Sequence, residues 1–292
     1  MPSEGELLAL STSSAPAEPG ASAEETPPSV GEAAEMTTPS VSTKLAKAAT
    51  TTGAHEVSSA AEVASSPPPT PTSTSTSNAP VQLPPPARLD FEVTGQAKGF
   101  GYHASAELVW QHDATSYHAH QEIKVIFLGS RSQDSVGSVT AHGLQPKRFG
   151  DRARSERAAH FDFASGRVTF SANTPAAPIE PGAQDRLSVF LQLASLLAAA
   201  PERYPSGTHI AMTTVSARAA DVWTFTVQAE QSLELPIGTL RAVPLERLPR
   251  REYDQKAQVW LAPSLGYLPV RIRLTEANGD FAELNLRGHE AP

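Results

Sequence analysis

The segment Gln184 to Pro201, QDRLSVFLQLASLLAAAP, constrains the fold more than any other part of the chain. On a helix its apolar side chains would cover most of the circumference, and its polar residues would form one narrow stripe at Ser188, Gln192 and Ser195. A helix of this kind needs cover on more than one side. Asp185 stands at its start, where a carboxylate can accept backbone N–H groups and complement the helix dipole. We predict a helix over 184–201 with only the polar stripe facing water.

The segments around this helix alternate between apolar and polar residues, as half-buried β-strands do. Short turns join the strands, and the pair Asn278-Gly279 is the strongest hairpin signal among them. The pattern predicts a mainly β fold: one curved antiparallel meander sheet, half-barrel-like, of about ten strands packed around a single apolar helix. Two roles stay open for that helix. It is an ordinary core helix between two layers, or it plugs a half-barrel that holds a ligand.

Composition divides the chain near Ala87. Residues 1–87 contain no Phe, Trp or Tyr, although the whole chain has 10 Phe, 3 Trp and 5 Tyr. They hold 14 of the 26 prolines and a net charge of 2 − 9 = −7. Such a segment has little apolar surface to bury, so we predict a disordered acidic linker rich in Pro, Ser, Thr and Ala over 1–87. An all-β domain with one central helix is expected over 88–290.

Charge and cysteine content exclude several classes of function. Beyond Ala87 the balance is 21 basic against 22 acidic residues, a net of −1, whereas nucleic-acid-binding domains are usually strongly basic. We therefore expect no nucleic-acid partner. The chain has no cysteine, so disulfides, zinc–thiolate sites and cysteine nucleophiles are absent. No apolar run reaches the length of a membrane span, and none resembles a signal peptide.

Two segments resemble the bacterial family catalogued as domain of unknown function 3108. They are HFDFASGRVTFSANTPAAPIEPGAQDRLSVFLQLASLLAAAPERYPSGT and REYDQKAQVWLAPSLGYLPVRIRLTEANGDFAELNLRG. The second is the more diagnostic, with WLAP at Trp260 to Pro263, YLPVRIR at Tyr267 to Arg273, and a turn at Asn278 to Asp280. The resemblance covers roughly Arg88 to Arg287.

The resemblance implies a curved β-sheet similar to those of envelope lipid and lipoprotein carriers. Members of the family typically come from Gram-negative bacteria and are exported or anchored near the N-terminus. This chain departs from that pattern, because no apolar span precedes its Pro-rich tract. The sequence therefore leaves two locations open: periplasmic or inner-membrane-tethered if an upstream anchor is missing from the gene model, or otherwise a soluble form of unknown location. The family brings no catalytic residue to carry over.

Seven residues are our candidates for contact with an apolar ligand. Four are aromatic side chains, which either pack in the core or line a groove that binds lipid. The other three are charged groups near the helix start or at the rim of the sheet. The candidates are Trp110, Phe190, Trp223, Trp260, Asp185, Arg186 and Arg271.

Two other groups of polar residues could form a metal site or an acid–base site, but both are better explained as structural. His118 and His120 would share a strand face as two metal ligands could, but Ile123 and Val125 take the opposite parity, so the histidines belong to a solvated face. The charged stretch 151–160 could supply an acid and a base, yet charged loops more often pair with each other at the surface. We predict no metal, no cofactor and no catalytic residue.

Two functions follow from these observations. The first is a non-enzymatic cell-envelope protein that binds or carries an apolar ligand, such as a lipid or an acyl chain, in the concave face of a β half-barrel. The second is a structural or protein-interaction domain with a filled core, on a long flexible tether and with an envelope protein as partner. A hydrolase is disfavoured, because no nucleophile elbow, phosphate-binding loop or dinucleotide fingerprint occurs.

Overall fold

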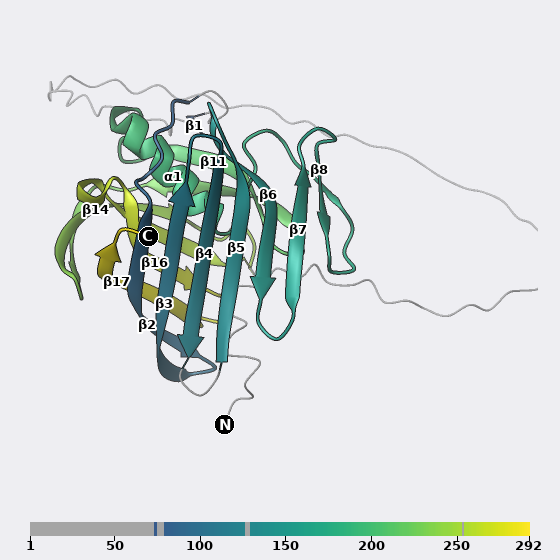
Figure 1. Cartoon of the computed structure of the whole chain (residues 1–292). Helices are drawn as coiled ribbons and strands as arrows, with labels where there is room; N and C mark the ends of the chain where they lie inside the picture. The colour runs from purple at the N-terminus through teal and green to yellow at the C-terminus, as the bar shows by residue number, and fades with distance from the viewer. Residues whose placement is uncertain (1–72, 75–78, 126–128, 253) are drawn as a thin grey trace, which may run out of the picture. The chain divides into compact units, whose positions relative to one another are not determined.

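The computed structural model describes residues 73–74, 79–125, 129–252 and 254–292. The prediction of a disordered linker over 1–87 falls largely outside these residues. Within them the chain forms one open sheet of 17 strands and one α-helix. The strands curve around the helix, which lies against the concave side of the sheet (Figure 1). The predicted fold class, a mainly β curved sheet packed around one apolar helix, is confirmed.

The first half of the sheet is a meander of consecutive antiparallel strands. It comprises β2 (Ala87–Ala97), β3 (Phe100–His112), β4 (Ser116–Val125), β5 (Gly129–Thr140), β6 (Gly143–Arg152), β7 (Glu156–Asp162), β8 (Arg167–Phe170) and β9 (Ala177–Pro178). The alternation that predicted these strands matches their burial. Leu89, Phe91 and Val93 of β2 are fully buried, while Arg88 and Glu92, which take the opposite parity, are exposed.

The second half begins with the helix and continues as strands. Its elements are β10 (Gln184–Asp185), α1 (Ser188–Ala199), the 3₁₀ turn η1 (Pro201–Arg203), β11 (His209–Val215), β12 (Ala220–Val227), β13 (Gln231–Leu235), β14 (Gly238–Arg247), β15 (Lys256–Ala262), the 3₁₀ turn η2 (Pro263–Leu265), β16 (Leu268–Thr275) and β17 (Phe281–Glu290). The last strand, β17, pairs antiparallel with β2 and joins the two halves into one sheet. The very short strand β1 (Ser73–Thr74) pairs parallel with β11, as does β10.

The strand count exceeds the expected ten for a simple reason. Three of the additional strands, β1, β9 and β10, are only two residues long, and such short pairings leave no periodic pattern in a sequence. β13 was also missed, although its two leucines, Leu233 and Leu235, are buried. The two parallel pairings depart from a purely antiparallel meander only at these short strands.

The helix is shorter and more deeply buried than predicted. It begins at Ser188, because Gln184 and Asp185 are extended and pair with β11. The expectation that the polar stripe faces water is wrong, since Ser188, Gln192 and Ser195 are 0 %, 4 % and 0 % exposed. Each polar side chain in the stripe is hydrogen-bonded within the protein, so the helix is covered on every side.

The segment just before β2 also belongs to the folded part. Gln82 donates its backbone N–H to Ser195 O in α1 at 3.0 Å, and Trp110 Nε1 donates to Pro84 O at 3.0 Å. Ala79 is 2 % exposed and lies in the hydrophobic core. The folded part therefore extends to residue 79, several residues before the boundary that composition placed near Ala87.

Candidate functional site

A cavity opens on the concave face of the sheet, beside the first turns of α1. The space between its lining side chains is about 840 Å³, including its open mouth. The lining comes from both halves of the sheet, from the helix and from the segments that lead into α1 and β15. It consists of Tyr102, Gln121, Ile123, Val125, Arg131, Gln133, Arg186, Phe190, Trp223, Gln255, Ile272, Leu274, Ala282 and Leu284.

Strand alternation explains why these residues meet. Side chains two residues apart point to one face of a strand, and residues paired across neighbouring strands point to the same side. The inward residues of β4 therefore stand next to those of β5, and those of β16 next to those of β17. The pairs are Gln121–Gln133, Ile123–Arg131, Ile272–Leu284 and Leu274–Ala282.

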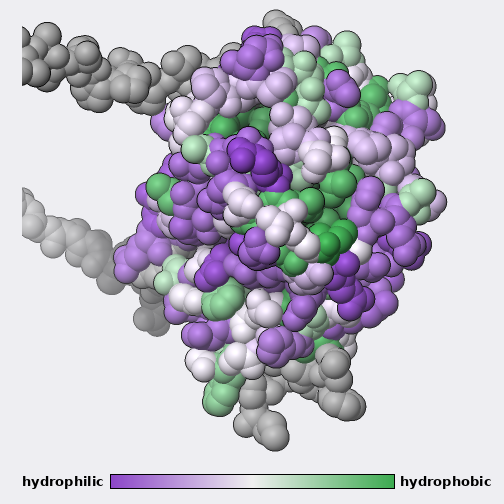
Figure 2. Space-filling model, turned by 90° about the vertical axis from the view of Figure 1, so that its left-hand side faces the viewer, coloured by the Kyte–Doolittle hydropathy of each residue, from purple (hydrophilic) through white to green (hydrophobic). Residues whose placement is uncertain are grey.

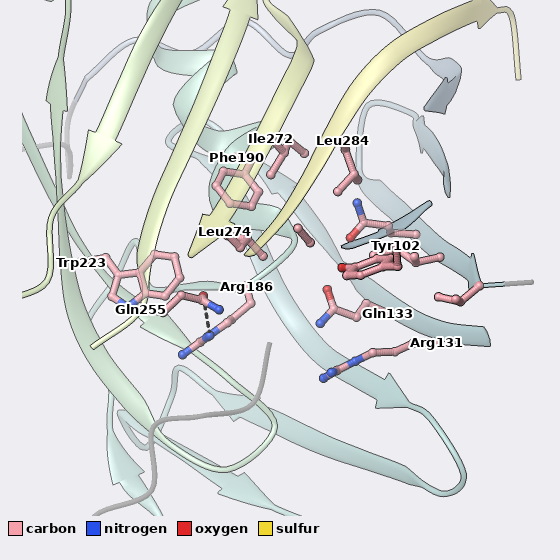
Figure 3. Close-up of a pocket in the computed structure, with 14 residues that line it drawn as sticks. Tyr102, Arg131, Gln133, Arg186, Phe190, Trp223, Gln255, Ile272, Leu274 and Leu284 are labelled. Atoms are coloured by element: carbon pink, nitrogen blue, oxygen red, sulfur yellow. Dashed lines mark hydrogen bonds between the residues drawn. The ribbon is translucent and has the colours of Figure 1, made fainter. Parts of the chain in front are cut away.

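Polar and apolar groups occupy different ends of the cavity. Phe190, Ile272 and Leu284 lie toward one end, whereas Arg131 and Arg186 carry their guanidinium groups toward the other (Figure 3). The cavity is thus amphipathic, with an apolar wall formed by the helix and β16–β17 and a polar end.

Trp223 lies between two arginines at the polar end. The Cζ atom of Arg186 is 4.8 Å from the ring centroid, and that of Arg247 is 4.7 Å from it. Both distances are within the range of cation–π attraction. Arg247 is 3 % exposed and is held by Asp254, 3.1 Å away, and by the backbone carbonyl of Gln255. Burial lowers the pKa of Arg247, while the carboxylates of Asp254 and Asp221 act against that shift.

Gln255 connects Arg186 to a carboxylate behind the cavity. Its side-chain oxygen accepts from Arg186 Nη1 at 3.1 Å, and its side-chain nitrogen donates to Glu276 Oε1 at 2.6 Å. Burial lowers the pKa of Arg186 to about 10 and raises the pKa of Glu276. The glutamine therefore presents a neutral amide to the guanidinium on the cavity wall, and the carboxyl group stays out of the lining.

Arg131 is fixed by a buried ion pair. Its guanidinium donates twice to the carboxylate of Asp151, with Nε 2.8 Å from Oδ1 and Nη2 in contact with Oδ2. Both residues are less than a tenth exposed. A bidentate pair of this kind fixes the plane of the guanidinium, and breaking it by removing one partner would leave a buried charge.

A second polar cluster lies at the start of the helix. The Asp185 carboxylate accepts from the backbone N–H groups of Leu187 and Ser188 at 2.9 and 2.7 Å and from Ser135 Oγ at 2.5 Å. In return, Ser188 Oγ accepts from the backbone N–H of Asp185 at 2.9 Å. This reciprocal arrangement resembles a capping box and confirms that the carboxylate receives backbone N–H groups at the helix start. Complete burial raises the pKa of Asp185 to about 6.

The structure brings three of the seven predicted ligand contacts together. Phe190, Trp223 and Arg186 line the cavity. Asp185 precedes Arg186 in the chain but does not line the cavity, because it is fully buried and bonded to Ser135 and to the start of the helix.

The other three predicted contacts lie elsewhere. Trp110 is fully buried against the segment before β2 and packs 5.8 Å from the ring of Tyr117. Trp260 and Arg271 are paired across β15 and β16, with the guanidinium 5.6 Å from the ring centroid. Arg271 also donates to Glu234 O of β13, so this pair belongs to the opposite face of the sheet from the cavity.

The polar groups weighed as other sites have structural partners. His120 Nδ1 and His118 Nε2 lie 2.7 and 3.4 Å from Asp134 Oδ1 on the outer face of β4 and β5. In the charged stretch, Glu156 pairs with Arg148 and Arg152.

Among the described residues, no three His, Cys, Asp or Glu side chains are arranged to hold a metal ion. None of the described helices is long and apolar enough to cross a membrane.

Sequence reasoning missed most of the cavity wall. Gln121 takes the inward parity of β4, where Ala119, Ile123 and Val125 are apolar, and an inward polar residue is a signal for a cavity. Gln133 lies opposite it on β5. Gln255 and Tyr102 gave no such signal, because their place in the lining depends on the curvature of the sheet.

A second hollow lies at the turn between β5 and β6. Its space of about 680 Å³ is bordered by His142, Leu144, Gln192 and Met212, among others. Gln192 is occupied in bonds to this turn: its side chain accepts from Leu144 N at 2.8 Å and donates to His142 O at 3.1 Å. These bonds use both the oxygen and the nitrogen of the Gln192 amide to hold the turn against α1.

Comparison with known proteins identifies the family. No curated protein sequence matches the chain. Among solved structures, a β-barrel-like protein of domain of unknown function DUF1849 from Brucella abortus is similar, at 13 % identity and a TM-score of 0.49, over 73 % of this chain and 99 % of that one. MucB is similar at 10 % identity and a TM-score of 0.29, over 74 % of this chain and 56 % of that one. A putative outer membrane lipoprotein-sorting protein domain from Vibrio parahaemolyticus is similar at 9 % identity and a TM-score of 0.26, over 70 % of this chain and 85 % of that one. The model of the family described as "Protein of unknown function (DUF3108)" matches residues 90–287, and the chain belongs to this family.

Proposed function

We propose that this protein binds an apolar or amphipathic small molecule in the cavity on the concave face of its sheet, without catalysing its conversion. The observation that carries the proposal is the apolar wall formed by Phe190 of α1 and the strands β16 and β17, which borders the cavity. Apolar walls with a few polar groups among them are typical of small-molecule sites, and this cavity has both.

The surrounding architecture suits binding. The cavity walls come from strands held by continuous ladders of backbone hydrogen bonds, and the helix beside them is buried along most of its length. A rigid wall lowers the entropic cost of ordering a site when the ligand enters. The polar groups at the cavity are guanidinium, amide, phenol and indole groups, and none of these is paired with a nucleophile in the way that covalent catalysis requires.

We further propose that the protein acts in the cell envelope. The long acidic Pro-rich tract before the folded part supports this, because its composition suits a tether between the domain and a surface. Cell fractionation followed by immunoblotting checks the location, and recovery of the protein only in the cytoplasmic fraction would contradict it.

The binding proposal is tested by lipid extraction and mass spectrometry of protein purified from a bacterial host. We expect a reproducible stoichiometric apolar ligand in the wild-type protein. In Ala282→Phe, a new ring would project from β17 into the cavity, and we expect ligand occupancy to fall by ~10-fold or more, since the apolar area available for burial is filled.

The matched control is Val222→Phe, which adds a ring at an exposed position of β12 that does not line the cavity. This variant should keep full occupancy. A wild-type protein that carries no ligand and gives no saturable binding of apolar dyes would overturn the proposal and favour an interaction domain that acts through its outer surface.

A further inference from the structure

We infer that the ligand of this cavity is a single-chain amphiphile with an anionic head group, a carboxylate or a phosphate, and that Arg186 receives the head while the chain lies against Phe190 and β16–β17. This inference rests on the proposed binding function and adds the chemistry of the ligand to it.

The first observation is the charge of the lining. Among the described residues, the cavity is lined by two arginines, three glutamines, one tyrosine, one tryptophan and apolar side chains, with no Asp or Glu. The nearby carboxylates of Asp151 and Glu276 lie behind the wall, held by Arg131 and by Gln255. The lining itself therefore offers guanidinium groups and other hydrogen-bond donors and contains no carboxylate.

The second observation is the separation of the two kinds of surface. Arg186 and Arg131 extend toward one end of the cavity, and Phe190, Ile272 and Leu284 lie toward the other (Figure 3). A ligand that satisfies both ends has a charged group at one terminus and an apolar chain at the other. A wholly apolar ligand would leave the donors at the polar end without contacts from the ligand, which disfavours its binding.

The third observation is the fixed position of Arg186. Its guanidinium lies over the Trp223 ring at 4.8 Å and donates to the neutral oxygen of Gln255. Stacking on an aromatic ring fixes the plane of the guanidinium, and a fixed planar fork suits bidentate recognition of carboxylate and phosphate.

The test compares three single-chain probes of equal chain length: palmitate, hexadecyl phosphate and uncharged hexadecanol. Affinities for the full-length protein are measured by displacement of a fluorescent apolar dye at about pH 8, well above the ordinary carboxyl range. We expect the better of the two anionic probes to bind at least ~10-fold more tightly than hexadecanol, as charge-assisted hydrogen bonds typically give. Comparing palmitate with hexadecyl phosphate shows which head group the site takes.

Arg186→Gln removes the charge and should reduce the preference for the anionic probe to less than ~3-fold, with hexadecanol affinity retained. Arg186→Lys keeps the charge and should restore part of the preference. The matched control is Arg273→Gln, which changes an arginine between the cavity residues Ile272 and Leu274 whose side chain instead pairs with Glu283 at 2.9 Å. This variant should bind all three probes as the wild type does.

The outcomes separate this inference from the function on which it rests. If the wild type binds hexadecanol as tightly as both anionic probes, the head-group inference is overturned and the apolar cavity stands. The inference also fails if the preference survives in Arg186→Gln. If none of the three probes binds, the proposed function itself is overturned.

Discussion

At the scale of single residues, Asp185 places a carboxyl group in the interior of the protein. It is fully buried, yet its carboxylate accepts hydrogen bonds from Ser135 and from two backbone N–H groups at the start of α1. Desolvation is the largest influence on its pKa, and it outweighs those hydrogen bonds, which act to lower the pKa. The sequence identified Asp185 as a helix-start residue, but its burial depends on contact with Ser135, fifty positions earlier.

This burial predicts a pH dependence of stability. The pKa of Asp185 rises from 3.8 to about 6 on folding, so the folded state holds the proton more tightly. The resulting contribution to stability is complete below about pH 4 and is lost as the pH rises through 6. Asp185→Asn removes the titration. The unfolding free energy of the wild type, relative to this variant, should fall by on the order of 3 kcal/mol between pH 4 and 7, measured by denaturant unfolding.

The control for this prediction is Asp162→Asn. Hydrogen bonds from Ser165 and Ala164 lower the pKa of the exposed Asp162, so its stabilising contribution has the opposite pH dependence and is lost as the pH falls through the acidic range. A constant difference between wild type and Asp185→Asn across the whole range would show that the buried carboxyl does not titrate as described.

At the scale of elements, the helix is joined to the β5–β6 turn by Gln192. The alternation of polar residues on α1 was visible in the sequence, but burial of the stripe was not, because it depends on partners that other elements supply. One such partner is Gly143, whose φ of +101° favours glycine. A Cβ atom there would lie 2.2 Å from the side-chain oxygen of Gln192.

We predict that Gly143→Ala destabilises the fold more than Gly207→Ala. Both glycines have positive φ, +101° and +92°, so the backbone strain of either substitution is about 1–3 kcal/mol. Nothing lies within 4 Å of a Cβ at Gly207, whereas a Cβ at Gly143 would displace Gln192 from its bonds to Leu144 and His142. Chemical denaturation should therefore give Gly143→Ala an unfolding free energy about 1–3 kcal/mol lower than that of Gly207→Ala.

A double-mutant cycle gives the decisive comparison. In a Gln192→Ala background the clash is absent, so Gly143→Ala should cost no more than Gly207→Ala. If Gly143→Ala lowers the unfolding free energy by the same amount in the Gln192→Ala background, the clash with Gln192 is not the cause of the destabilisation.

At the scale of the whole molecule, two distant parts of the chain complete the domain. The last strand, β17, pairs with the first long strand, β2, and the segment 79–86 lies across α1 and the end of β3. That segment supplies the acceptor for the buried Trp110 Nε1 and a donor for Ser195 O. It is Pro-rich, which is why composition alone assigned it to the linker.

A chain that begins at residue 87 should therefore melt at a lower temperature than one that begins at residue 73. Removal of residues 73–86 takes away Pro84 O, the acceptor of the Trp110 indole N–H. A buried donor without an acceptor costs about 1–3 kcal/mol of stability. For a domain of this size that free energy corresponds to a fall in melting temperature of about 2–12 °C. Thermal unfolding followed by circular dichroism measures the difference, with the full-length chain as reference. Equal melting temperatures of the two shortened chains would show that the segment adds nothing to the fold.

The sequence alone determined the fold class and the place of the helix, because both depend on a local period of apolar residues. It also identified Arg186, Phe190 and Trp223, three residues of the cavity lining, as candidates.

The tertiary structure alone decided which inward side chains border the cavity and which are packed against other side chains. That distinction depends on the curvature of the sheet and on the pairing of β17 with β2, which bring Tyr102 and Leu284 to one wall although they are far apart in the chain. Local periodicity shows which face of a strand is turned inward, but only the folded chain fixes what each inward side chain meets.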